Sequence, residues 1–185
     1  MANTCRTRIK IEASTKAIQN FVERFDKCVD GYYPNTLTDK PHIIDEFGAK
    51  AELLIDRIGS KWVSIWDGGI EYHTDTYCEF SLESAWYPPS DMILEMFRQM
   101  EEIDGQSEGV RVYGSYWDEG YEPIGVFEVY HGQIIEIENH DLPNEVDWED
   151  EIIIEDYTDR NFWDEVVEPA FLIIQDELDK VIKEI

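Results

Sequence analysis

Two histidine–carboxylate pairs and one dense acidic stretch are the residues of this chain that could bind a metal ion. His73 lies two residues before Asp75, and His140 is followed directly by Asp141. The stretch DWEDEIIIEDYTD, residues 147–159, supplies the carboxylate oxygens that hard cations prefer. The chain contains no HExxH motif, no CxxC pair and no DxDxDG calcium loop. The sequence therefore predicts no dedicated metal site and no cofactor.

The three cysteines are the candidates for nucleophilic catalysis. Cys78 falls in an alternating stretch on the same side as Phe80 and Leu82, which predicts a buried structural thiol. Cys5 and Cys28 receive the same interpretation. An odd number of cysteines at unrelated spacings is typical of reduced thiols in a cytosolic protein.

The segment WDEGYEP, residues 117–123, sets Asp118, Glu119 and Glu122 beside two aromatic residues. A glycosidase needs a second carboxylate placed across its site, and nothing in the sequence supplies one. Neither glycine-containing stretch that could bind phosphate leads into a helix, as such a site requires. The segment is interpreted as an acidic hairpin tip, and we expect no catalytic residues and no enzymatic activity.

Charge is the most unusual property of the chain. Its 185 residues include 42 acidic and 15 basic ones, for a formal net charge of -27 and a pI near 4.2. A field of this sign repels nucleic acid and anionic membranes, and no apolar run approaches the roughly 18 residues of a membrane span. The aromatic content of 13% argues against global disorder. We therefore expect a folded cytoplasmic protein that binds neither membrane nor nucleic acid directly.

Aromatic residues of the predicted strands would suggest base stacking in a basic protein, but the charge here has the wrong sign for a phosphate backbone. Core packing and protein contact are the better interpretations for Trp62, Trp66, Trp86, Tyr113, Tyr116 and Trp117.

Hydrophobic periodicity in the first half predicts strands and one helix. Alternation over residues 5–13 predicts a half-buried strand, and helical spacing follows up to Cys28, with Ser14 or Thr15 as the N-cap. Residues 42–60 are ambiguous, with a short helix preferred. Residues 61–75 are interpreted as two strands around a turn at Asp67-Gly68-Gly69.

The second half begins with another alternating strand over residues 76–86. Pro88 and Pro89 then predict the start of a helix, with Ser90 as its N-cap. Two further strands follow, the second broken at Gly132, and an amphipathic helix over 160–185 closes the chain, with Pro169 able to delay its start.

This element order predicts an α+β protein with a ferredoxin-like, or split βαβ, antiparallel sheet and helices on one face. We place this domain at residues 1–138. Residues 139–185 are expected to form an acidic connection and a C-terminal amphipathic helix packed on the same domain.

Four pieces of the sequence carry a resemblance to a known family. They are MANTC at the start, GSKW at 59–62, ESAWYPP at 83–89 directly before a helix, and YEPIGVFEVYHG at 121–132. In this order they resemble the YubB-like ferredoxin-like proteins encoded by plasmids and phages. The likeness covers about residues 1–133. It implies a ferredoxin-like sandwich and a mobile-element origin, and it implies no catalytic residues.

The charge leaves three functional classes open. The first is a binding protein that imitates nucleic-acid charge and blocks a basic host defence protein of restriction or CRISPR type, because clefts that bind phosphates also bind carboxylates. The second is an acidic structural or accessory protein of a mobile element, and the third is a small cytosolic enzyme. Homodimer formation is also left open. For the first class the expected contacts are the anchors Trp148 and Tyr157 and the carboxylates Glu145, Asp147, Glu149, Asp150, Glu151, Glu155, Asp156 and Asp159.

Overall fold

The computed structural model describes residues 4–29, 60, 63–105, 109–118, 123–139, 164 and 167–185, without the side chains at 24, 26–29 and 64–68. The short helix predicted within 42–60 and the acidic stretch 140–159 lie outside these residues. The described part contains six strands and three helices: β1 (Thr4–Glu12), α1 (Thr15–Val29), β2 (Val63–His73), β3 (Tyr77–Ala85), α4 (Ser90–Asp104), β4 (Arg111–Asp118), β5 (Ile124–Tyr130), β6 (Gln133–Asn139) and α6 (Glu168–Glu184).

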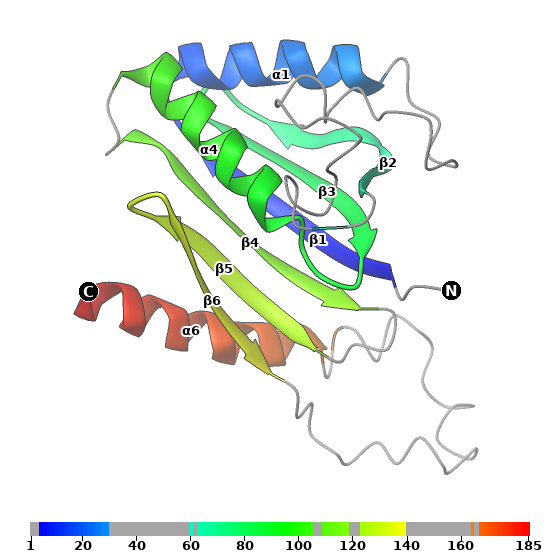
Figure 1. The fold of residues 1–185 in the computed structure, drawn as a ribbon, viewed down its shortest axis with the longest axis vertical. Helices are drawn as coiled ribbons and strands as arrows, with labels where there is room; N and C mark the ends of the chain where they lie inside the picture. Colours follow the sequence, from blue (N-terminus) through cyan, green and yellow to red (C-terminus); the bar gives the residue numbers. More distant parts are fainter. Residues whose placement is uncertain are drawn as a thin grey trace.

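The six strands form one sheet in the order β2-β3-β1-β4-β5-β6, and every neighbouring pair is antiparallel. The predicted α+β class with an antiparallel sheet is therefore confirmed. Figure 1 shows α1 and α4 on one side of the sheet and α6 on the other.

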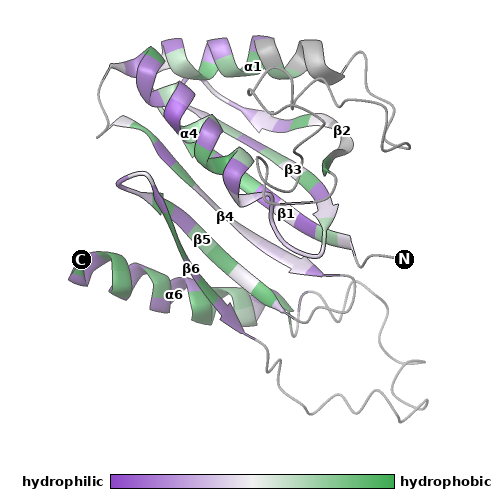
Figure 2. Cartoon of the chain, viewed as in Figure 1, coloured by the Kyte–Doolittle hydropathy of each residue, from purple (hydrophilic) through white to green (hydrophobic). Residues whose placement is uncertain are grey.

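Two separate hydrophobic clusters hold these layers together. The larger one joins α1 and α4 to inward residues such as Ile9, Phe80 and Tyr116. The smaller one joins α6 to Trp117 and Ile124. Because successive residues of a strand face opposite sides, Tyr116 and Trp117 alone place the two clusters on opposite faces of β4. β5 is covered on both sides, which explains its largely hydrophobic colouring in Figure 2.

The ends of α1 and α4 show which of the predicted capping residues terminate these helices. The Ser14 hydroxyl accepts a hydrogen bond from the Ala17 N–H at 3.3 Å, as expected of an N-cap. The expected cap at Ser90 is wrong, because α4 begins at this residue and its hydroxyl instead donates to the Pro88 carbonyl at 3.4 Å. α4 ends at Gly105, whose φ of 70° lets its N–H reach the Glu101 carbonyl at 2.8 Å.

The turn expected at Asp67-Gly68-Gly69 is wrong. β2 runs through these residues as one strand paired with β3, and the register shifts between Ile65 and Ile70. Gly69, at a φ of 144°, lets the backbone absorb this irregularity without leaving the sheet.

The break expected at Gly132 is confirmed. β5 and β6 are joined by the two-residue turn His131-Gly132, and both residues have positive φ, 50° and 75°. Two left-handed residues in succession match the right-handed twist of a tight hairpin. Gly132 supplies one of these positions without strain.

The last helix begins later than its hydrophobic pattern indicates. α6 starts at Glu168, with Pro169 in its first turn, where a missing N–H costs no hydrogen bond. Ala170, Ile174 and Leu178 form its buried stripe. Asp164 and Val167, before the proline, are already in π-helical conformation, so Pro169 marks the start of the α-helix and not of all helical structure.

Candidate functional site

All ten residues predicted to contact a partner, from Glu145 to Asp159, lie outside the described residues. Of the groups weighed for catalysis, His73 and Asp75 are exposed, whereas Cys78 is fully buried. A substrate that reached the imidazole could not reach this thiol. Among the described residues, no group of three histidine, cysteine, aspartate or glutamate side chains is arranged to hold a metal ion.

The polar side chains that the fold does bring together lie on the sheet face opposite α1 and α4. The alternation of β1 sends Arg6, Arg8, Lys10 and Glu12 to this side while Cys5 and Ile9 enter the core. Its antiparallel neighbours add their own outward residues in register. We call this set the polar sheet face: Arg6, Arg8, Lys10, Glu12, Tyr77, Glu79, Ser81, Glu83, Arg111, Tyr113, Ser115 and Glu128.

Ion pairs connect β1 to β3 across this face. The Nε atoms of Arg6 and Arg8 lie 3.5 Å from carboxylate oxygens of Glu83 and Glu79 respectively. Glu79 also accepts a hydrogen bond from the Tyr77 hydroxyl at 2.7 Å. Cross-strand pairs of this kind contribute roughly 0.2–1 kcal/mol each, so they fix side-chain positions more than they stabilise the fold.

A tighter arrangement connects β4 to β5 and β1. Arg111 donates two hydrogen bonds to Glu128, at 2.9 and 2.7 Å, and its guanidinium lies 4.2 Å from the ring centre of Tyr113. The Tyr113 hydroxyl donates to Glu12 at 2.9 Å. Burial, followed by this bond to a carboxylate, raises the pKa of Tyr113 to about 12. The phenol therefore stays protonated and acts as a donor.

The polar sheet face is neutral in a chain of charge -27. Its four basic residues are balanced by Glu12, Glu79, Glu83 and Glu128. Residues 140–185, by contrast, hold 16 of the 42 acidic residues and only three of the 15 basic ones. The excess of negative charge is therefore spread unevenly along the chain.

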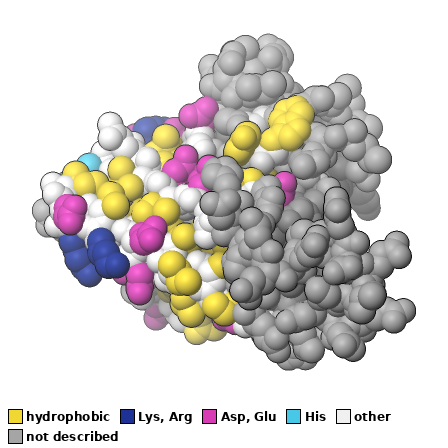
Figure 3. Space-filling view, turned by 90° about the horizontal axis from the view of Figure 1, so that it is seen from below, with side chains coloured by type: hydrophobic (Ala, Val, Ile, Leu, Met, Phe, Trp, Pro, Cys, Tyr) yellow, Lys and Arg dark blue, Asp and Glu magenta, His cyan; other side chains and the backbone are white. Residues whose placement is uncertain are grey.

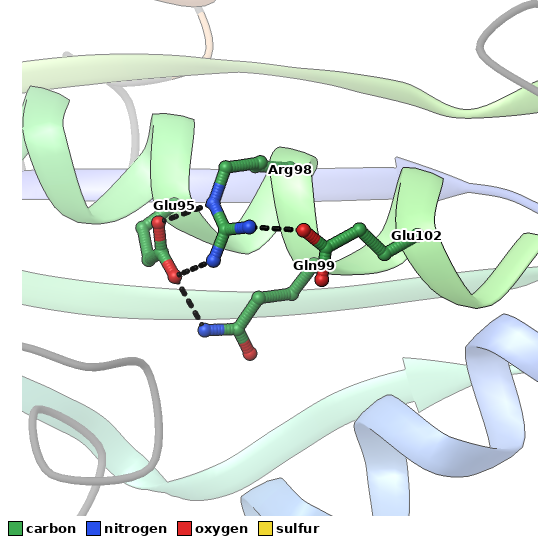
Figure 4. Close-up of polar contacts among 4 residues, drawn as sticks. All are labelled: Glu95, Arg98, Gln99 and Glu102. Atoms are coloured by element: carbon green, nitrogen blue, oxygen red, sulfur yellow. Dashed lines mark hydrogen bonds and ion pairs between the residues drawn. The ribbon is translucent and has the colours of Figure 1, made fainter.

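Helix α4 contains a single arginine, Arg98, which pairs with carboxylates of the same helix. Arg98 donates to Glu95 at 2.8 and 2.6 Å and also pairs with Glu102, while Gln99 donates to Glu95 at 2.6 Å (Figure 4). The side chains of Arg98 and Glu102 are 53% and 64% exposed and that of Glu95 is 28% exposed, so each ion pair contributes only about 0.3–0.5 kcal/mol. The remaining acidic residues of α4, among them Glu101 and Asp104, keep its surface negative.

The core side of the sheet carries a second polar cluster near the ends of β4 and β6. The hydroxyl of the buried Tyr116 donates a hydrogen bond to Glu138, and its ring occupies the space that a side chain at Gly125 would fill. Burial and this bond raise the pKa of Tyr116, and burial beside Glu138 raises that of Glu136. Cys5 lies on the same face, its Sγ 3.9 Å from the Thr7 hydroxyl. Tyr116 and Cys5 are buried, whereas Glu138 is half-buried and Glu136 is exposed, so this cluster lies at the edge of the core and its thiol is not accessible to a substrate.

Burial makes the two described thiols unreactive. Cys5 and Cys78 are 1% and 0% exposed, and loss of hydration raises the pKa of each from 9.0 to about 12. A thiolate is the reactive form of cysteine. The expectation of structural thiols is thus confirmed for both residues, whereas the side chain of Cys28 lies outside the description.

We predict that a Cys28→Ser variant shows no thiol that reacts quickly with an aromatic disulfide reagent at pH 8, and two such thiols after unfolding in urea. A pKa shift from 9.0 to about 12 lowers the thiolate population roughly 1000-fold. Because ionisation is disfavoured only in the folded state, stability should fall as the pH rises from 9 towards 12. Rapid reaction of the folded variant would contradict this assignment.

No described helix is both long and apolar enough to cross a membrane. The described part of the face seen from below carries hydrophobic and acidic side chains side by side (Figure 3). On α6 the exposed hydrophobic residues include Leu172 and Ile173, at 65% and 61% exposure.

Comparison of the chain with family models, with curated proteins and with solved structures gave no match. The likeness to YubB-like proteins therefore stays a prediction.

The polar sheet face was not predicted as a unit from the sequence. The alternation of basic residues in β1 is visible there, but their partners at 79 and 83 are about 70 residues away. Only the order β3-β1-β4 brings the two sets together.

Proposed function

We propose that this protein is a non-enzymatic binding protein, encoded by a phage or plasmid, that inhibits a host nucleic-acid-binding defence protein in the cytoplasm. It does so by presenting carboxylates to the cationic channel that receives DNA or RNA. The observation that carries the proposal is the charge of -27, concentrated towards the C-terminal end of the chain. Duplex DNA presents one negative charge per about 1.7 Å of its axis. Arginine side chains that bind phosphates also bind carboxylates.

The distribution of charge supports imitation over a uniformly acidic, solubilising surface. A solubilising surface needs negative charge on every side, yet the polar sheet face carries equal numbers of both signs. Together α4, α6 and the stretch 140–159 carry 16 of the 27 net negative charges, and the stretch alone carries 9 of them. We assign the partner contacts to Glu145, Asp147, Trp148, Glu149, Asp150, Glu151, Glu155, Asp156, Tyr157 and Asp159.

The fold proposed for this function is a ferredoxin-like core with an added acidic extension. Support comes from the order β2-β3-β1-β4 with α1 and α4 on one face, which is the strand order of the split βαβ plan. β5, β6 and α6 extend this core at one edge. Membership of the YubB-like family, proposed from the four sequence pieces, is consistent with the same plan.

The test is capture of a partner from bacterial host lysate by the immobilised protein at low salt, followed by elution with duplex DNA or RNA. We expect a basic nucleic-acid-binding protein that is released by added nucleic acid and by high salt, because both compete for the same cationic groups. Recovery of no such protein, or of one that nucleic acid does not displace, would rule the proposal out.

A matched pair of variants separates local charge from total charge. In the first, the eight carboxylates assigned to the contact set become amides, and we expect capture to fall at least tenfold. In the control, eight exposed carboxylates elsewhere become amides: Glu23, Glu71, Asp75, Asp91, Glu168, Asp176, Glu177 and Glu184. The net charge change is the same, so equal loss in both variants would leave no role for the stretch 145–159.

A further inference from the structure

The polar sheet face has features of an interface that the proposed function does not use. No described helix covers its β1 and β3 residues, because α1 and α4 pack on the opposite side and α6 lies over β5 and β6 (Figure 1). The arginine side chains remain substantially exposed, at 42% for Arg6 and 43% for Arg8. The cross-strand contacts hold their side chains in place over the sheet, so a partner would meet an ordered surface.

The charges on this face are arranged in two columns of opposite sign. β1 contributes the basic column Arg6, Arg8 and Lys10, and β3 contributes the acidic column Glu79 and Glu83. The columns are adjacent because β1 and β3 are neighbours in the sheet. In register, Arg6 is opposite Glu83 and Lys10 is opposite Glu79.

This pattern is complementary to itself. Consider a second copy rotated by a two-fold axis that runs parallel to the strands, between β1 and β3, above the face. The rotation places β1 of each copy over β3 of the other, at the roughly 10 Å spacing of packed sheets. Because the rotation preserves position along the strands, Arg6 then faces Glu83 of the second copy, and Lys10 faces its Glu79.

We propose that the polar sheet face is the interface of a two-fold symmetric homodimer in which the basic column of each copy lies over the acidic column of the other. Two chains of charge -27 repel each other, and a neutral, self-complementary face is where they can approach with the least like-charge contact. A nucleic acid would meet the acidic column and the repulsion of the whole chain. An apolar partner would meet few apolar side chains here.

Reciprocal charge reversal gives the proposal a direct test by sedimentation velocity at physiological salt. One variant carries Arg6→Glu and Lys10→Glu, and the other carries Glu79→Lys and Glu83→Lys. Each variant alone should be monomeric, since like charges would face each other across the axis. An equimolar mixture should regain the dimer, because the acidic face of one variant then meets the basic face of the other.

Several results would overturn the proposal. These are a wild-type chain that stays monomeric up to about 1 mM, reversal variants that still self-associate, and a mixture that does not. Circular dichroism first confirms that each variant is folded. If charge reversal prevents folding, the variant Glu79→Gln with Glu83→Gln is measured in its place. Its dimer dissociation constant should be at least tenfold higher than that of the wild type. An unchanged dissociation constant refutes the interface.

The exposed residues of α6 supply the control surface. Leu172→Ser with Ile173→Ser removes two hydrophobic side chains of α6 that are 65% and 61% exposed and do not belong to the polar sheet face. We expect this variant to dimerise like the wild type. Loss of the dimer here, with retention in the sheet variants, would assign the interface to α6. The dimer does not rest on the proposed function, so a result that refutes the dimer does not refute the proposed function, and the reverse also holds.

Discussion

Replacement of Phe80 by alanine is expected to lower the free energy of unfolding by about 3–5 kcal/mol. Phe80 is fully buried on β3, and its ring centre lies 5.4 Å from that of Phe21 and 4.7 Å from that of Phe25. Both neighbours belong to α1, which makes this ring the main aromatic link between the helix and the sheet. Truncation leaves a cavity that three rings cannot close by small movements, since protein cores are packed as densely as crystals.

Urea denaturation followed by far-ultraviolet circular dichroism measures this loss. Tyr87→Ala is the matched control, because it removes an aromatic side chain of similar size that is 59% exposed. We expect the control to change stability by about 0.5 kcal/mol or less. A Phe80→Ala variant within about 1 kcal/mol of the wild type would show that α1 is not held to the sheet through this cluster.

Local signals in the sequence predict the elements of this fold better than their arrangement. Alternation over residues 4–12 determines which side of β1 is buried, and it needs no knowledge of the neighbouring strands. Proline and glycine likewise determine where α4 begins and ends, because their backbone constraints are intrinsic.

Signals that depend on context are less dependable. Asp67-Gly68-Gly69 is a common turn sequence, yet β2 continues across it as one strand that pairs with β3 on either side, at Ile65 and at Ile70. Ser90 is a common capping residue, but α4 starts one position too early for its hydroxyl to act as the cap. In both cases the surrounding structure, and not the local sequence, determines which conformation the residues adopt.

The polar clusters are harder still to predict. Arg6 and Glu83, or Tyr116 and Glu138, become neighbours only once the strand order is known. A sequence with 42 acidic residues offers each arginine many candidate partners. The acidic stretch 140–159, by contrast, is evident from the sequence alone. It is recognised by its composition, which does not depend on which strands pair.

Replacement of Leu178 by alanine is expected to release α6 from the sheet more readily than it unfolds the rest of the protein. Leu178 is fully buried in the smaller hydrophobic cluster, with Trp117, Ile124 and Val126. Because this cluster is separate from the one beneath α1 and α4, its loss should act first on α6 and on the sheet strands that it covers. The expected reduction is about 2–5 kcal/mol in the free energy of opening of α6.

Hydrogen–deuterium exchange distinguishes this local opening from global unfolding. Backbone amides of α6 and β6 should exchange faster in the Leu178→Ala variant, while those of β1 and β3 stay close to wild type. Leu172→Ala makes the same chemical change on the same helix at a side chain that is 65% exposed, so we expect its exchange pattern to match the wild type. Equal acceleration in both variants would mean that α6 is destabilised as a helix, without any contribution from its packing on β5 and β6. Equal acceleration across the whole sheet would mean that the two hydrophobic clusters unfold together as one cooperative unit.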